Sequence, residues 1–125
     1  MDWKFSSDRA IYSQIVEQIK LFIVSGYFAK GDKIASVREL AADAGVNPNT
    51  MQKALTELER DGLLYSSRTS GRFITDDSEL IASTKKEFAD EKIADFLLSM
   101  KKLGYTRQES IQLIENYDIG GKDDE

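Results

Sequence analysis

The sequence of 125 residues has no cysteine, no histidine and only one proline. The missing cysteine excludes disulfides, thiolate metal sites and a cysteine nucleophile, and the missing histidine removes the commonest general base and metal ligand. We therefore predict a protein that is not an enzyme and has no catalytic residues, metal or cofactor. No apolar run approaches the roughly 20 residues of a membrane span, and no apolar signal core follows the first residues. These two absences predict a cytoplasmic protein with no membrane partner.

A surplus of basic residues is also missing, since the formal net charge is −5. Residues 1–76 hold ten basic and ten acidic side chains, whereas residues 77–125 hold seven and twelve. The acidity therefore belongs to the C-terminal part. A neutral N-terminal part predicts modest non-specific affinity for phosphate, so specific binding of nucleic acid would rest on individually placed contacts and on dimerisation.

A capping box and a glycine mark the first of two short helices predicted between residues 34 and 64. The Ser36 hydroxyl can accept a hydrogen bond from the Glu39 amide while the Glu39 carboxylate accepts one from the Ser36 amide. Gly45 stands at the position where the end of a helix needs a positive φ. These signals predict that the helix begins after Ser36 and ends before Gly45.

The second helix is predicted to begin after Asn47 and to stop at Gly62. Asn47 supplies a capping side chain, and Pro48 takes the first helical position, where its missing N–H costs nothing. Apolar residues recur at i, i+3, i+4 and i+7, which leaves the opposite face polar. Two helices joined by a glycine turn, the second polar on its outer face, are typical of a helix-turn-helix. The predicted buried face consists of Met51, Ala54, Leu55 and Leu58.

The flanking segments extend this pattern to a winged helix-turn-helix. Residues 1–10 predict an arm or a short strand, and residues 11–25 predict an amphipathic helix. The aromatic pair Tyr27 and Phe28 in the following turn is predicted to join the core. Residues 63–75 predict a β-hairpin with arginines beside its turn. We therefore predict a mostly α fold with one small hairpin, the wing.

The C-terminal part predicts two helices that need a partner surface. Residues 78–103 keep a helical pattern for about seven turns, and a capping box at Thr106 opens a last helix. At roughly 45 residues these helices cannot close a core of their own, and a symmetric dimer would bury their apolar stripe. The predicted domains are residues 1–76 (winged helix-turn-helix), 77–118 (helical dimerisation region) and 119–125 (disordered tail). The predicted dimer interface consists of Phe88, Phe96, Leu97, Met100, Leu103, Ile111 and Ile114.

Several of these segments together closely resemble the GntR family of bacterial transcription regulators. The matching stretches are IYSQI from residue 11, GDKI from residue 31, SVRELA from residue 36, GVNPNT from residue 45 and ALTELE from residue 54. The NPNT stretch and LGYTRQE from residue 103 are similar to the YtrA-type subfamily, which has a short helical dimerisation tail. The resemblance implies a repressor that binds a double-stranded, two-fold DNA operator as a homodimer. Ala35 and Thr69 depart from the family, which usually has proline and glycine there.

The resemblance also implies which residues contact DNA. The planar guanidinium of Arg38 suits phosphate, and the alternative for this side chain is an ion pair with Glu39 or Asp43. The start of the second helix favours a phosphate, and Asn49 can pair with adenine in the major groove. Arg68 suits a narrow minor groove, although edge hairpins also carry charge to block strand pairing. The predicted DNA-binding residues are Ser36, Arg38, Asn47, Asn49, Thr50, Gln52, Lys53, Arg68, Gly71 and Arg72.

Other interpretations stay open at this stage. A winged helix can bind protein instead of DNA, and the neutral charge of residues 1–76 favours that alternative. A solvated helix face would equally explain Gln52 and Lys53, and a capping role alone would explain Asn47. A small-molecule effector could bind between the helical tail and the winged domain, although no residue identifies it.

Overall fold

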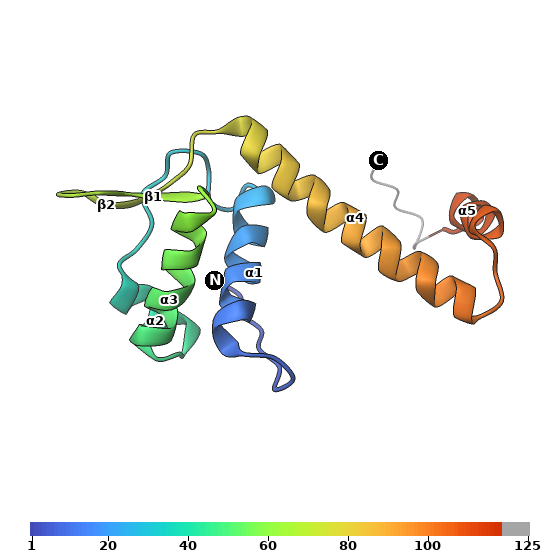
Figure 1. Cartoon of the computed structure of the whole chain (residues 1–125), viewed down its shortest axis with the longest axis horizontal. Helices are drawn as coiled ribbons and strands as arrows, with labels where there is room; N and C mark the ends of the chain where they lie inside the picture. Colours follow the sequence, from blue (N-terminus) through green and yellow to red (C-terminus); the bar gives the residue numbers. More distant parts are fainter. Residues whose placement is uncertain (119–125) are drawn as a thin grey trace. The chain divides into compact units, whose positions relative to one another are not determined.

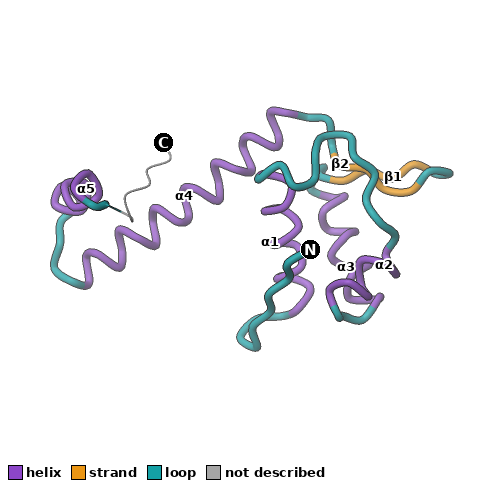
Figure 2. The backbone as a smooth tube through the Cα atoms, turned by 180° about the vertical axis from the view of Figure 1, so that it is seen from behind, coloured by secondary structure: helices purple, strands orange, loops and turns teal. Residues whose placement is uncertain are grey.

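The computed structural model describes residues 1–118, which form five helices and one antiparallel hairpin (Figures 1 and 2). This part of the chain confirms the predicted winged helix-turn-helix with two further helices, and the predicted tail at 119–125 lies outside it. The elements are α1 (Ile11–Val24), α2 (Val37–Ala44), α3 (Pro48–Arg60), β1 (Leu64–Ser67), β2 (Gly71–Ile74), α4 (Ser78–Lys102) and α5 (Arg107–Asn116).

The chain divides into two compact units, the first running from Met1 to Lys86 and the second beginning at Glu87. The first unit, called the winged unit below, includes the first turns of α4, whose Leu80 and Ile81 pack against its core. The predicted boundary after Asp76 stays a prediction.

The core of the winged unit forms where α3 packs against α1, α2 and β1 (Figure 1). Each helix contributes one apolar face, because its apolar residues recur with the helical period. The predicted buried face of α3 is confirmed, since its four side chains have no exposed surface. The largest fully buried side chains in this core are Ile15, Ile19, Leu40, Met51, Leu55, Leu58, Leu63, Leu64 and Ile74.

The predicted caps fix both ends of the α2–α3 turn. The Glu39 amide donates to Ser36 Oγ at 3.1 Å, and the Ser36 amide donates to Glu39 Oε1 at 3.0 Å, which completes the capping box. Gly45 has a φ of 72°, the left-handed conformation that favours glycine. Asn47 Oδ1 then accepts from the Asn49 amide at 2.7 Å and opens α3. Local signals in the sequence therefore determine this turn.

The hairpin packs on the rest of the winged unit through one face, and one of its edges pairs with the segment before α2. Leu64 lies opposite Ile74 in the antiparallel register, and both side chains are buried. The segment before α2 pairs with the outer edge of β2: the Ile34 amide donates to the Arg72 carbonyl at 3.0 Å, and Lys33 forms a single bridge with Phe73. Figure 2 shows this segment beside the two strands.

The N-terminal residues form an arm along α1, which decides between the predicted arm and short strand. Two glutamine side chains of α1 bind the arm backbone, because Gln14 Oε1 accepts from the Ser6 amide at 2.8 Å and Gln18 Oε1 accepts from the Lys4 amide at 2.9 Å. Trp3 Nε1 donates to Asp43 Oδ2 at 2.9 Å and so ties the arm to α2.

The prediction that Tyr27 joins the core is wrong. Tyr27 is 60% exposed, while Phe28 is half-buried and packs against the core as expected. The Trp3 ring of the arm meets the Phe22 ring edge-on at 5.5 Å. The Tyr27 ring lies at the surface of this aromatic group, 5.2 Å from the Phe22 ring and 5.4 Å from the Phe28 ring.

The second unit contains the rest of α4 and the helix α5. The predicted capping box at Thr106 is confirmed: the Glu109 amide donates to Thr106 Oγ1 at 3.1 Å, and the Thr106 amide donates to Glu109 Oε1 at 2.9 Å. Several large apolar side chains of this unit are exposed, including Ile93, Leu98 and Leu103 at 55%, 56% and 72%. Across residues 1–118, no helix has the length and apolar character needed to cross a membrane.

The core placement of α3 generates a first prediction. Leu55→Ala should lower the free energy of unfolding by about 2–5 kcal/mol, because truncation of a fully buried leucine leaves a cavity. Leu21→Ala removes the same atoms from a side chain of α1 that is 39% exposed, and should cost less than about 1 kcal/mol. Urea unfolding followed by circular dichroism measures both values. Equal losses in the two variants would contradict this core.

Candidate nucleic-acid interface

The outer face of α3 carries a line of polar side chains opposite its buried face. Asn49, Gln52 and Lys53 are all exposed, and they share one side of the helix because they stand three and four residues apart. Gln52 Nε2 donates to Thr56 Oγ1 at 3.1 Å on the next turn. Within residues 1–118, the Asn49 side chain makes no hydrogen bond. This face can therefore present amide donors and acceptors to the edges of bases in a major groove.

Lys53 lies against an aromatic ring of α1. Its Nζ is 3.8 Å from the centroid of the Tyr12 ring, a cation–π contact. Tyr12, Ile11 and Lys53 line a shallow hollow together with Asn49 and the half-buried Thr50. Tyr12 lies in the amphipathic helix predicted over residues 11–25. Its place beside the polar face of α3 was missed, because the two positions are far apart in the chain and no local pattern links them.

The first turn of α2 presents Arg38, whose exposed side chain makes no hydrogen bond or ion pair within residues 1–118. The alternative from the sequence, an ion pair with Glu39 or Asp43, is absent from the described structure because both acids are engaged elsewhere. The backbone amide and then the hydroxyl of Ser36 lower the pKa of Glu39 below its ordinary value. The indole N–H of Trp3 lowers the pKa of Asp43. Since Arg38 pairs with neither carboxylate in the described residues, its guanidinium keeps its donors for another acceptor.

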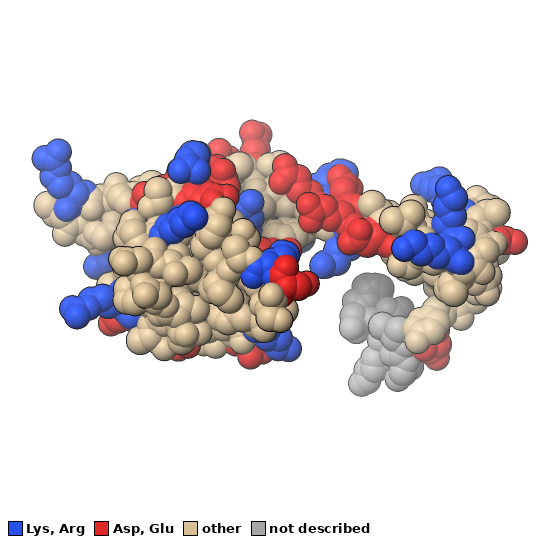
Figure 3. Space-filling view, turned by 60° about the horizontal axis from the view of Figure 1, so that its bottom comes forward, with Lys and Arg blue, Asp and Glu red and all other residues tan. Residues whose placement is uncertain are grey.

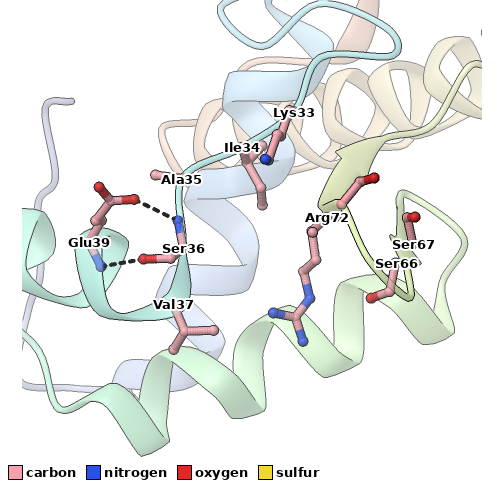
Figure 4. Close-up of a pocket in the computed structure, with 11 residues that line it drawn as sticks. Lys33, Ile34, Ala35, Ser36, Val37, Glu39, Ser66, Ser67 and Arg72 are labelled. Atoms are coloured by element: carbon pink, nitrogen blue, oxygen red, sulfur yellow. Dashed lines mark hydrogen bonds between the residues drawn. The ribbon is translucent and has the colours of Figure 1, made fainter.

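A groove of about 760 Å³ separates the start of α2 from the wing (Figure 4). Lys33 and Ser36 line one side, while Ser67 and Arg72 of the strands line the other. Gly71 at its edge has a φ of 100°, and a Cβ there would lie 3.2 Å from Lys33 Cε. The left-handed backbone explains this glycine, because the flexible end of the Lys33 side chain could move aside, and the predicted contact of Gly71 with DNA stays a prediction.

The two arginines of the wing are in different environments. Arg68 is exposed at the turn and makes no ion pair within the described residues. Arg72 is half-buried, and its Nε donates to Glu59 Oε2 of α3 at 2.9 Å. The structure therefore leaves Arg68 available to an external anion, whereas part of the Arg72 guanidinium is already bound.

Basic residues do not gather into one patch on the face of the winged unit shown in Figure 3. Lysines and arginines are separated there by uncharged surface, with acidic side chains nearby. This distribution agrees with the equal numbers of basic and acidic residues in the sequence up to residue 76. Binding of a phosphate backbone by this unit would depend on a few placed cations, not on a broad positive field.

A helix-turn-helix with an exposed polar face on its second helix, an unpaired arginine on its first and a wing beside them defines a winged-helix DNA-binding protein. Residues 11–74 match the model of the family described as "Bacterial regulatory proteins, gntR family". The chain belongs to the GntR family and is a DNA-binding transcriptional regulator.

Similar proteins extend the comparison beyond the winged unit. An uncharacterized HTH-type transcriptional regulator of Bacillus subtilis, YhcF, is 38% identical over 121 residues, which cover 97% of this chain and 100% of that protein. The HTH-type transcriptional repressor YtrA of the same organism is 42% identical over 73 residues, 58% of this chain and 56% of that protein. A GntR family regulator from Listeria monocytogenes has a similar structure, with a TM-score of 0.83 at 36% identity over 91% of this chain and 100% of that one.

The contact between Trp3 and Asp43 generates a prediction on pH. The folded-state pKa of Asp43 lies below its ordinary value of 3.8, so the contribution of this contact to stability is present at neutral pH. It is lost as the pH falls through the folded-state pKa, below 3.8. Trp3 is the single tryptophan of the chain, and its fluorescence should change in that range.

Asp43→Asn keeps the shape of the side chain and removes its titration, so the same transition should be absent from this variant. Circular dichroism recorded in parallel restricts the comparison to pH values at which the helices are intact. Identical fluorescence titrations of the two proteins would show that Asp43 does not control the environment of the indole.

Proposed function

We propose that this chain is a repressor that binds a two-fold DNA operator as a homodimer. In this proposal α3 enters the major groove, while the start of α2 and the wing contact the backbone or the minor groove. The observation that carries the proposal is the exposed polar face of α3 beside the unpaired Arg38. A dimer bound to the operator would block access of RNA polymerase. It would act in the cytoplasm, where bacterial DNA lies.

The arrangement of α2 and α3 supports separate roles for their first turns. Asn49, whose side chain makes no hydrogen bond within residues 1–118, suits a base edge, because an amide can donate to and accept from adenine. Arg38 suits a phosphate, which its fork of N–H groups can bind in a bidentate manner. Asn47 uses its carbonyl oxygen as a cap and keeps its amide N–H groups for a phosphate at the helix start. Ser36 likewise keeps its hydroxyl hydrogen.

Lys53 and Gln52 suit contacts one turn further along α3. Lys53 is held near the Tyr12 ring at 3.8 Å, which reduces the conformational freedom that its long side chain would lose on binding. Gln52 would exchange its bond to Thr56 for a base edge. These roles stay proposals for the DNA complex.

Repression is proposed because the family likeness extends to YtrA, which is named a repressor. Modulation by a small-molecule effector stays a prediction from the sequence.

Dimerisation through the second unit is supported by its exposed apolar side chains. Phe96, Leu103 and Ile114 are 37%, 72% and 56% exposed in the single chain, while Phe88, Leu97, Met100 and Ile111 are half-buried. Exposure of many large apolar residues on so few turns favours an interface between two chains. Such a dimer would give the two-fold symmetry that an inverted-repeat operator requires.

The DNA-binding part of the proposal predicts a selected sequence. Purified protein, incubated at moderate salt with random double-stranded DNA, should enrich an inverted repeat. Arg38→Ala should weaken binding of that repeat and of unrelated DNA alike and lower the salt slope by about one unit. Asn49→Ala should cost about 1–3 kcal/mol on the repeat and relax the preference at one base pair of each half-site.

Lys92→Ala, which removes a cation from the second unit, serves as the control for loss of charge. A folded, dimeric protein that enriches no sequence would contradict the proposal and would favour the alternative, a winged helix that binds protein.

The dimer part of the proposal predicts a loss of association when a charge enters the apolar surface. Phe96→Glu and Leu103→Glu should each convert dimers to monomers, because a buried carboxylate without a partner is strongly unfavourable. Sedimentation velocity at micromolar concentration measures the mass. Lys92→Glu introduces the same side chain at a polar position of α4 and should leave the dimer intact. A monomeric wild-type chain would refute this part.

A further inference from the structure

One carboxylate of α3 binds both strands of the wing. Glu59 Oε2 accepts a hydrogen bond from Arg72 Nε of β2 at 2.9 Å and another from the Ser66 hydroxyl of β1. Ser66 and Arg72 lie directly opposite each other in the antiparallel register. A single oxygen atom on the recognition helix α3 is therefore shared by a cross-strand pair of the hairpin.

The place of the Ser66–Arg72 pair in the hairpin shows which part of the wing the Glu59 carboxylate holds. Side chains alternate between the two faces of a strand, so Ser66 and Arg72 lie on the same face as Leu64 and Ile74. Leu64 and Ile74 are buried at the base of the hairpin, and the Ser66–Arg72 pair stands two residues nearer the turn. The apolar core thus fixes the base of the wing, and the Glu59 carboxylate fixes its outer half.

The contact is partly shielded from water, since the side chains of Arg72 and Glu59 are 20% and 26% exposed. A charge-assisted hydrogen bond in this environment is stronger and more directional than one between neutral groups. The donor is the Arg72 Nε–H, which lies close to the stem of the side chain. Its direction therefore follows the strand, and the bond restricts the orientation of β2 toward α3.

We propose that Glu59 is a positioning residue for DNA binding, which holds the wing at a fixed orientation to α3. Arg68 at the turn and Asn49 at the start of α3 are then kept at the separation that simultaneous contact with one operator half-site requires. This inference rests on the proposed function, because it assumes that both elements contact the same DNA.

The proposal predicts that loss of Glu59 changes DNA affinity in the direction opposite to that expected from charge repulsion alone. Loss of an acidic residue near a phosphate backbone removes repulsion and should tighten binding modestly. Loss of Glu59 should instead weaken binding, because the wing no longer meets the DNA in register with α3. Glu57 on the same helix provides the matched control, since its side chain makes no hydrogen bond or ion pair within the described residues.

The experiment compares Glu59→Ala with Glu57→Ala on the operator selected by the wild-type chain and on unrelated DNA. Glu59→Ala should lower specific affinity about tenfold, the effect of one lost charge-assisted hydrogen bond, and leave non-specific affinity unchanged or raised. Glu57→Ala should bind at least as tightly as the wild type. Equal or stronger operator binding by Glu59→Ala would overturn the proposal.

A second variant excludes general damage to the fold. Glu59→Gln keeps an acceptor oxygen for Ser66 and Arg72 while losing the charge, so its specific affinity should lie between those of the wild type and Glu59→Ala. In the Glu59→Ala background, Arg68→Ala should cost less than it does in the wild type. Full additivity of the two substitutions would overturn the proposal, because it would mean that the wing still engages the DNA normally.

Hydrogen exchange of the free protein separates this inference from the proposed function. In the absence of DNA, backbone amides of β1 and β2 should exchange faster in Glu59→Ala than in Glu57→Ala. If the wild-type chain selects no operator, the proposed function fails, and the exchange data alone then decide whether Glu59 holds the wing. Equal exchange rates in the two variants would overturn the inference in either case.

Discussion

The rest of the winged unit depends on the burial of one face of α3. Met51, Ala54, Leu55 and Leu58 have no exposed surface, and they join α3 to α1, α2 and the first strand of the hairpin. The opposite face of α3 is exposed and carries Asn49, Gln52 and Lys53, so this packing also determines which of its side chains are available to DNA. The helical period of the apolar residues in α3 therefore produces both the buried side of the helix and its polar side.

The sequence was most informative where structure is determined by neighbours along the chain. The capping box at Ser36, the left-handed Gly45, the Asn47 cap and both strands of the hairpin were predictable, because each depends on a few consecutive residues. The hydrogen bond from Trp3 of the arm to Asp43 of α2 was not predictable, because it joins residues that are 40 positions apart in the chain.

The same distinction explains the other differences between expectation and structure. Tyr27 was assigned to the core from its aromatic character alone, but its ring packs on Phe22 and Phe28 at the surface and stays exposed. Arg68 and Arg72 were both predicted to contact DNA from the two sides of the turn, yet within the described residues only Arg72 pairs with a carboxylate of α3. Residue type and local pattern establish what a side chain can do, whereas the packing of remote elements determines which of these possibilities is used.

The equal numbers of basic and acidic residues up to residue 76 bear on how a regulator finds its site among the rest of the genome. A protein with a broad positive surface spends much of its time on unrelated DNA, since a chromosome offers about a million or more competing sites. When the winged unit is nearly neutral, a smaller fraction of the regulator molecules is bound to unrelated DNA. Occupancy of an operator then depends on the ratio of specific to non-specific affinity, so even a moderate absolute affinity can suffice for a regulator present in few copies.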